Sequence, residues 1–438
     1  MSTFWLCCLA FFMKSIIFAG MKHVYLAVII VFWSILFWLN PQIAQAQRHV
    51  VLSPRIASLQ VVAGNHWLSM PVTSIDGEPI NISFDDMTHT YHRYVYQLTH
   101  CEADWTPTQG LFASDYLEGF NGMMTIEDYE QSLNTTHLYT HYRLSIPNEN
   151  CRIKMGGNYK LTVYDEEENE PVFEACFMIV EPKLSVSLGV STNTDIDING
   201  RHQQVGMAIK YDGLRVTQPE KQLKTVVLQN GRWDNAVWNV APDFQSASGM
   251  EWRHKRELVF EGGNEYRKFE MLDLNHTTMG VEDIKWDGNS FHAYLFVDEP
   301  RPGYVYDESA NGSFYVRNSD NQENDITSDY AWVHFRLCAD RQEGEVYLNG
   351  DWTYDSFLPQ WRMEYDEQEH VYHAAVLLKQ GYYSYQYLVL RADGTTLPVY
   401  SEGNFFQTVN QYQALVYYRG IGERTDRLVG YKEVIRTE

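Results

Sequence analysis

The sequence predicts an all-β protein built from β-sandwich domains in tandem. From Val50 onward, short runs of alternating apolar and polar residues recur between Gly, Pro, Asn and Asp, a pattern typical of sandwiches or barrels. Aromatic residues make up 14% of the chain, including 30 Tyr and 12 Trp, and β-rich folds favour such residues. The length of 438 residues predicts two to four domains at about 100–200 residues each.

The charge balance is acidic, with a formal net charge of −23. Direct binding to nucleic acid is disfavoured, because contact with phosphates needs a basic surface. An acidic surface instead favours solubility and a partner that is neutral or locally basic.

Residues 1–46 are predicted to be an upstream segment and a secretory signal peptide, outside the fold. Met21-Lys22-His23 is a short basic start, residues 25–39 are almost wholly apolar, and Ala44-Gln45-Ala46 offers a cleavage site before Gln47. A hairpin of two membrane helices is the weaker alternative, because each apolar run falls short of the ~20 residues that span a bilayer. No later stretch approaches that length, so we expect no transmembrane segment after cleavage.

The first sandwich domain is predicted at residues 47–183, with strands where alternation is clearest. The last two strands form a hairpin around an acidic turn. The expected strands are Leu59–Val62, Ile80–Phe84, Tyr94–Thr99, Tyr139–Leu144, Tyr159–Tyr164 and Val172–Val180.

A long loop interrupts this domain between Cys101 and Thr136, where we find no clear strand and no long amphipathic helix. Loops beyond about 12–15 residues are uncommon inside compact domains and are usually functional or disordered. This loop is rich in Tyr, Phe and Trp, so we expect it to be ordered and packed on the sandwich. Either its aromatic residues contact a partner, or they only close the end of the sandwich.

The second sandwich domain is predicted at residues 184–318, a polar linker at 319–328 and a third, early-set-like sandwich at 329–438. The linker holds one apolar residue and cannot help to build a core. The expected strands are Leu184–Leu188, Gln204–Ile209, Lys224–Gln229, Arg256–Phe260, Lys268–Leu272 and Phe291–Val297, then Ala331–Leu337, Glu345–Asn349, Tyr372–Leu378, Tyr382–Val389 and Gln413–Tyr418.

The sequence offers only weak candidates for metal ligands and catalytic residues. His137 and His141 have a four-residue spacing that places two ligands on one face only in a helix. They flank a strand pattern, in which residues four apart lie about 13 Å apart. Glu102 and Asp104 are suitable types for an acid–base pair, but such a pair needs a separation of roughly 5–10 Å and a raised pKa, and sequence shows neither. We predict no enzyme, no metal and no cofactor.

Two polar segments of the second domain carry residue types that dominate interface hot spots. They contain Arg232-Trp233 and Glu265-Tyr266-Arg267. In one interpretation they face a partner. In the other, Glu265 pairs with a nearby Arg inside the chain and supports the two loops.

The third domain resembles the glycogen- and starch-binding module of early-set immunoglobulin folds. The resemblance rests on Gly350-Asp351-Trp352, Trp361 and residues 380–385, and covers about a quarter of the chain. It implies immunoglobulin-like sandwich domains and a second candidate function, a carbohydrate-binding protein whose exposed tryptophans stack on sugar rings. Tryptophans that only fill the core are the alternative.

Taken in order, a series of motifs resembles the plug protein family of the type 9 secretion system. The match runs over nearly the whole mature chain, with an extra start segment and Gly156-Gly157 as departures. The motifs are His100–Trp105, Tyr116–Asn121, Ser132–Thr135, Tyr139–Tyr142, Gly157–Tyr159, Gln229–Asn235, Gly263–Arg267 and Lys379–Tyr383.

This resemblance implies a periplasmic protein at the inner side of the outer membrane. It docks on the periplasmic mouth of the translocon barrel, closes it when idle and has no catalytic or cofactor residues. We expect the long loop to supply the aromatic anchors and the acids that pair with basic groups, followed by the second-domain segments. The predicted interface residues are Asp104, Trp105, Tyr116, Glu118, Phe120, Arg232, Trp233 and Arg267.

Overall fold

The computed structural model describes residues 49–119 and 122–436, which all belong to one compact unit, Ala46–Glu438. Strands take up about 49% of these residues and helices about 6%, in several antiparallel sheets. The prediction of an all-β chain of sandwich domains is therefore confirmed. The predicted signal peptide lies outside the described residues. Within them, no helix has the length and apolar character needed to cross a membrane.

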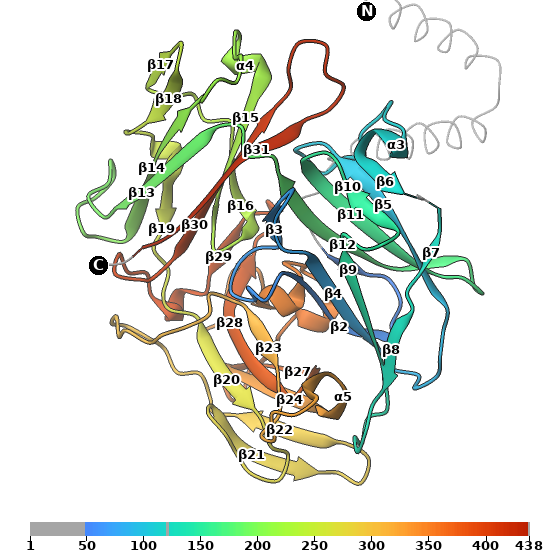
Figure 1. Cartoon of the computed structure of the whole chain (residues 1–438). Helices are drawn as coiled ribbons and strands as arrows, with labels where there is room; N and C mark the ends of the chain where they lie inside the picture. Colours follow the sequence, from blue (N-terminus) through green and yellow to red (C-terminus); the bar gives the residue numbers. More distant parts are fainter. Residues whose placement is uncertain (1–48, 120–121, 437–438) are drawn as a thin grey trace, which may run out of the picture. The chain divides into compact units, whose positions relative to one another are not determined.

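The first sandwich packs two sheets around one core (Figure 1). The first sheet runs β1 (Val50–Val51), β12 (Glu170–Val180), β11 (Gly157–Asp165), β5 (Tyr94–Cys101) and β7 (Met124–Thr125), with β3 (Val72–Ser74) beside β12. The second runs β2 (Ile56–Ala63), β4 (Ile80–Asp86), β9 (Thr140–Ile146) and β8 (Asp128–Gln131). The long loop, in which the sequence showed no clear strand, contains α3 (Ala113–Tyr116), β6 (Leu117–Gly119), which pairs with β10 (Cys151–Ile153), and the strands β7 and β8.

Strand β12 is buried on both faces, which explains its almost continuous apolar sequence. Because side chains alternate along a strand, Phe177 and Ile179 enter the core of the first sandwich. Met178 and Val180 point the other way, into a second cluster that includes residues of β15 and β30. A layer of apolar side chains therefore joins the first sandwich to the second.

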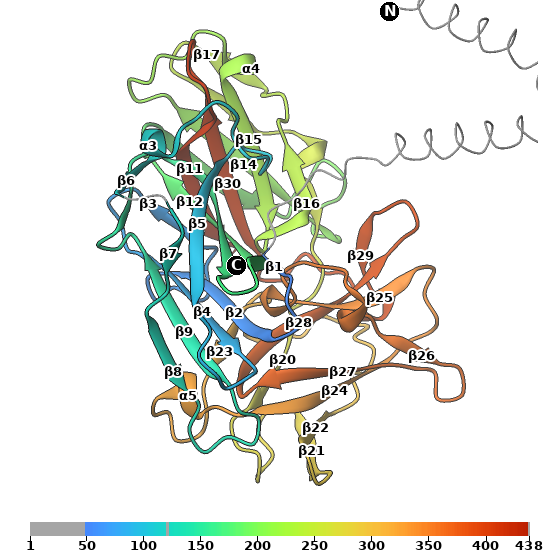
Figure 2. The same cartoon turned by 90° about the vertical axis from the view of Figure 1, so that its right-hand side faces the viewer.

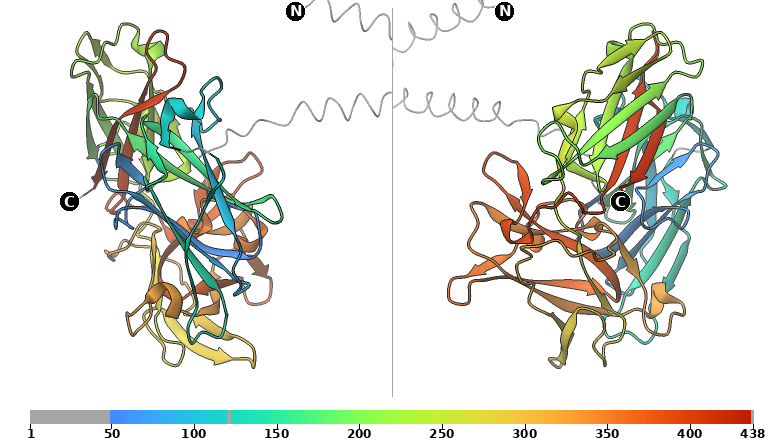
Figure 3. Two further views of the ribbon diagram at one scale, coloured as in Figure 1. Left: turned by 45° about the vertical axis from the view of Figure 1, so that its right-hand side comes forward. Right: turned by 90° about the vertical axis from the view of Figure 1, so that its left-hand side faces the viewer.

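The second sandwich combines strands from two distant parts of the chain. One sheet runs β13 (Ser185–Ser191), β14 (His202–Lys210), β18 (Gly249–Trp252) and β17 (Phe244–Ser246), with β19 (Val259–Glu261) beside β14. The other runs β16 (Arg232–Trp238), β15 (Leu223–Gln229), β30 (Gln411–Tyr418) and β31 (Arg427–Ile435). Figures 1 and 3 show the red C-terminal strands beside the green ones. The short helices are α4 (Pro219–Gln222) and η1 (Arg256–Leu258).

The third sandwich lies between these two parts of the second in the sequence (Figure 2). One sheet runs β20 (Arg267–Met271), β28 (Gly381–Leu390) and β23 (Phe314–Val316), and β25 (Glu345–Asn349) and β29 (Thr396–Pro398) also pair with β28. The other runs β21 (Val281–Trp286), β22 (Phe291–Leu295), β24 (Tyr330–Cys338), β27 (Val371–Lys379) and β26 (Glu364–Asp366). The short helices are α5 (Asn324–Thr327), η2 (Asp351–Thr353), η3 (Pro359–Trp361) and η4 (Tyr400–Glu402).

The strand pairing crosses the domain boundaries expected at residues 184–318 and 329–438. Strand β30, expected in the third domain, pairs with β15 of the second. Strands β20 and β23, expected in the second domain, pair with β28 of the third. Hydrogen bonding between strands is set by which edges meet, and sequence distance does not restrict it. We therefore propose a revised division in which residues 184–261 and 411–435 form the second sandwich and residues 267–398 the third.

The predicted linker at 319–328 is not a free connection. Residues 324–327 form α5, whose Ile326 is buried. The Ile326 carbonyl accepts a backbone hydrogen bond of 2.9 Å from Leu133 of the first sandwich. The hydroxyl of Tyr139 donates to the Ser328 carbonyl at 2.6 Å. Buried Ile326, backbone hydrogen bonds and the ion pair of Asp325 with Arg143 therefore attach this segment to the first sandwich.

Candidate functional site

The start of the long loop lies between the first and second sandwiches. After β5 the chain turns at Glu102–Trp105, where the Trp105 amide donates to the Glu102 carbonyl at 2.9 Å. The Trp105 side chain is 1% exposed and meets Trp233 of β16 edge to face, with 5.9 Å between ring centroids. Both belong to the apolar cluster that also contains Tyr417 of β30. The turn is therefore part of a buried junction.

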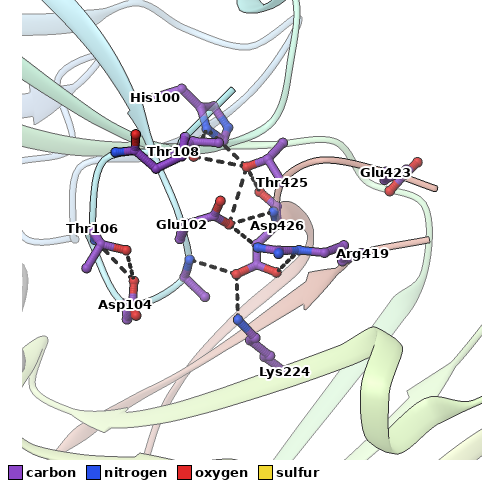
Figure 4. Close-up of polar contacts among 12 residues, drawn as sticks. His100, Glu102, Asp104, Thr106, Thr108, Lys224, Arg419, Glu423, Thr425 and Asp426 are labelled. Carbon is purple, nitrogen blue, oxygen red and sulfur yellow. Dashed lines mark hydrogen bonds and ion pairs between the residues drawn. The ribbon is translucent and has the colours of Figure 1, made fainter. Parts of the chain in front are cut away.

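A polar network surrounds Asp426 at the edge of this junction (Figure 4). One carboxylate oxygen of Asp426 accepts hydrogen bonds from the Lys224 ammonium at 2.7 Å and from the Ala103 amide at 3.1 Å. The other accepts from the Arg419 guanidinium at 3.0 Å. Asp426 thus joins the long loop to β15 and to the segment that connects β30 with β31.

Glu102 completes the network from the side of the first sandwich. Its carboxylate accepts from the Asp426 amide at 2.9 Å and pairs with Arg419. The Thr425 hydroxyl lies 3.1 Å from the Thr108 hydroxyl and 3.3 Å from Nδ1 of His100. Glu102, Ala103, Thr108 and His100 of the first sandwich therefore each contact the connecting segment Arg419–Asp426.

The pKa values of Asp426 and Glu102 are shifted in opposite directions. Burial opposes the ionised form of Asp426, but Lys224, the Ala103 amide and Arg419 outweigh it and hold the pKa of that carboxyl below its usual range. Burial raises the pKa of Glu102, and the nearby Asp426 charge adds to this rise. Asp426 is therefore the anion on which the network depends.

We expect Asp426→Asn to lower the free energy of unfolding by about 1–3 kcal/mol, since it weakens a buried, charge-assisted set of hydrogen bonds. The low pKa of Asp426 means that its contribution is complete above the pKa of an unfolded Asp and is lost as the pH falls through the folded value. Urea unfolding at neutral and acid pH measures both effects.

Glu423→Gln, on the same connecting segment, is the matched control, because Glu423 is exposed and contacts the Gly420 amide and, at 3.9 Å, Arg427. Equal unfolding midpoints for Asp426→Asn, Glu423→Gln and the wild type at neutral pH contradict a stabilising role for the network.

Beyond the network, two loops form a tip that faces solvent. Arg424 donates to the Gly110 carbonyl at 2.8 Å and pairs with Asp115 of α3 at 2.9 Å. Phe112, three residues before Asp115, is 75% exposed, and Ile421, three residues before Arg424, is 82% exposed. We call Phe112 and Ile421 the apolar tip. It combines large exposed apolar side chains with loops that are held in place.

Two of the predicted loop anchors, Trp105 and Tyr116, are buried. Trp105 is buried at the junction, and Tyr116 is 8% exposed, with its hydroxyl donating to the Leu98 carbonyl at 3.2 Å. Packing inside the chain already covers these two side chains, which argues against an anchor role in this conformation, and the role stays a prediction. Asp104 and Glu118 are exposed, and their role stays a prediction. Phe120 lies outside the described residues.

The second-domain anchors are also internal. Arg232 is 7% exposed and forms two hydrogen bonds with Asp234, at 3.0 and 2.6 Å. Arg267 pairs with Glu402 and Asp298, both at 2.7 Å. Together with buried Trp233, these residues support loops within the chain. The internal interpretation is thus the better one, although Glu265 accepts from Tyr304 and the Val409 amide instead of pairing with an Arg.

The two tryptophans on which the carbohydrate interpretation rests pack against the core of the third sandwich. Trp352 is 3% exposed and donates to the Ser384 carbonyl at 3.1 Å. Trp361 packs against it edge to face at 5.6 Å. Buried Trp352 does not present the open ring face that stacking on a sugar needs, and half-buried Trp361 is engaged in packing against it, so neither residue supports the carbohydrate interpretation.

Sequence reasoning missed the apolar tip and the Asp426 network. The segment Gly420-Ile421-Gly422 did offer a signal, since a large apolar residue between two glycines in a turn has no strand face to occupy. Asp426, Lys224 and Arg419 offered none, because acids and bases on three separate segments only acquire meaning when the strands pair.

Comparisons with known proteins identify relatives of the chain. Residues 56–181 match the family model described as type 9 secretion system plug protein 1st domain. A crystal structure of a hypothetical protein from Parabacteroides merdae ATCC 43184 is 39% identical, with a TM-score of 0.86, and the match covers 90% of this chain and 100% of that one. A search of curated proteins found no match.

Proposed function

Because the chain belongs to the type 9 secretion system plug protein family, we propose that it docks on the periplasmic mouth of the translocon barrel and closes it sterically. The family is in general non-catalytic, so the proposal needs no chemical step. The observation that carries it is the family match over residues 56–181, which include the first sandwich apart from β1, and its long loop. Export by the predicted signal peptide would deliver the protein to that side of the outer membrane.

A plug must stay rigid while it blocks a pore, and the contacts between the sandwiches of this chain meet that requirement. The apolar cluster and the Asp426 network join the first sandwich to the second. The buried pair of Lys379 and Asp85 joins the first to the third, with 2.6 Å between Nζ and Oδ2. The sandwiches therefore act as one body, which is suited to a steric gate.

We place the contact with the barrel at the apolar tip. A standard interface buries about 1,200–2,000 Å², yet its affinity depends on a few anchors, commonly large side chains near its centre. Phe112 and Ile421 are exposed, and Arg424 holds their loops together. Asp104 and Glu118, which are exposed in the same part of the chain, remain proposed partners for basic groups of the barrel.

The test is the double variant Phe112→Ser with Ile421→Ser, made in the full chain in its native host. We expect at least about a 30-fold loss of affinity for the barrel, since removing a central anchor typically costs about 2 kcal/mol or more. Co-purification with the barrel and leakage of large antibiotics through the outer membrane measure binding and closure.

The matched control is Val305→Ser with Tyr400→Ser, since both residues are strongly exposed, at 76% and 89%, but lie on other loops. Both double variants should retain the wild-type melting temperature. A tip variant that still binds and keeps the membrane tight shows that the contact lies elsewhere. If deletion of the whole protein causes no leak, the gating role itself is wrong.

A further inference from the structure

A recess opens where residues of all three sandwiches meet. Its walls come from β2 and the following loop, from the β15–β16 turn with β30, and from η2 with the start of β23. The cavity volume is about 110 Å³. We call it the three-way recess, and the lining residues that matter here are Trp67, Trp233, Asn311, Asp351, Tyr354 and Asp355.

The recess is acidic. Asp351 is exposed to the solvent inside the recess, whose walls surround it with protein. Its Oδ2 accepts a hydrogen bond from the Ser313 hydroxyl at 2.7 Å. Loss of hydration, to which the charge of Asp355 adds, raises the pKa of Asp351 to about 7 in spite of that hydrogen bond. The neighbouring Arg232 forms two hydrogen bonds with Asp234, and its charge also acts on Asp355.

An unsatisfied acceptor independently indicates a ligand with N–H donors. The side-chain oxygen of Asn311 is buried and has no donor among residues 49–119 and 122–436. A buried acceptor without a donor costs about 1–3 kcal/mol, so a ligand that supplies an N–H group recovers free energy there. The aromatic residues Trp67, Trp233 and Tyr354 line the same space, and aromatic faces attract organic cations.

The size of the recess restricts the ligand. Sites for drug-sized molecules have volumes of about 300–1,000 Å³, which exceeds the 110 Å³ of this recess. An oligosaccharide therefore does not fit, whereas the head of one basic side chain does. We propose that the three-way recess binds a single ammonium or guanidinium group, from a basic side chain of a partner protein or from a small free cation. This binding does not depend on the proposed role as a plug.

The experiment titrates the folded mature chain with two probes by calorimetry. Methylguanidinium represents the free cation, and the blocked peptide acetyl-Gly-Arg-Gly-amide represents the side chain of a partner. Methylurea and the matching citrulline peptide are the uncharged controls. Saturable binding of methylguanidinium alone assigns the recess to a free cation, and binding of the peptide assigns it to a protein side chain.

We expect Asp351→Asn to weaken the bound probe at least tenfold, and Asp340→Asn, an exposed acid outside the recess, to leave it unchanged. Affinity should rise as the pH increases through about 7, where Asp351 becomes ionised. Asp355→Asn serves as a second variant if Asp351→Asn fails to fold. Absence of saturable binding by both probes, equal binding of the uncharged controls, or unchanged binding by the folded recess variants overturns the proposal.

Discussion

Lys379→Met is expected to lower the free energy of unfolding by about 3–5 kcal/mol, because it leaves a buried carboxylate without its cation. Lys379 and Asp85 are 1% and 0% exposed at their side chains, and Nζ lies 2.6 Å from Oδ2. The ammonium also lies 4.1 Å from the ring centroid of Tyr139. No water can replace the lost charge at such a depth without opening the contact between the first and third sandwiches.

The other neighbours of Asp85 depend on its charge. Tyr330 donates to the same oxygen at 2.6 Å, and Nδ1 of His141 lies 2.6 Å from the other. Burial alone would raise the pKa of Asp85, but Lys379 and His141 outweigh it and hold that pKa below its usual value. The carboxylate is thus stabilising above the pKa of an unfolded Asp, and this contribution is lost as the pH falls through the folded value.

Denaturant unfolding of Lys379→Met, Asp85→Asn and the double variant measures the coupling. The double variant should be more stable than the sum of the single effects predicts, because it buries no unpaired charge. If a single variant lowers the free energy of unfolding by less than about 1 kcal/mol, the pair is no stronger than an exposed surface ion pair and this account is contradicted.

Trp105→Ala is expected to lower the free energy of unfolding by about 3–5 kcal/mol, the usual cost of removing a large aromatic side chain from a core. The residue is 1% exposed and packs on Trp233 across the junction between two sandwiches. Its loss therefore leaves a cavity that the two sheets cannot close without moving together. Differential scanning calorimetry of the purified chain measures the effect.

Phe112→Ala is the matched control on the same loop, since an exposed substitution usually changes stability by less than about 0.5 kcal/mol. A cycle with Trp233→Ala tests the contact directly, because residues in contact show coupling energies of about 0.5–3 kcal/mol. If Trp105→Ala melts like the wild type but no longer binds the barrel, Trp105 is a surface anchor and its buried position in the structure is wrong.

Local pattern determined the fold class and most strands. Alternation at Tyr94–Thr99 predicted β5, Tyr94–Cys101, and the apolar run at Val172–Val180 predicted the core of β12, Glu170–Val180. These features depend on the period of a strand and on burial of one face, which neighbouring residues in the sequence specify. The family resemblance also followed from motifs along the chain, and the match over residues 56–181 supports it.

The tertiary structure decided which strands share a sheet and which aromatic residues are exposed. The alternating pattern of Gln413–Tyr418 predicts a strand with one apolar face. Only its pairing with the edge of β15 places this strand, β30, in the second sandwich. Trp105 and Phe112 are both large aromatic residues of one loop, yet one is buried at a junction and the other is open to solvent. Burial and pairing arise from contacts between segments that lie far apart in the chain, and the free energy of those contacts is absent from any local pattern.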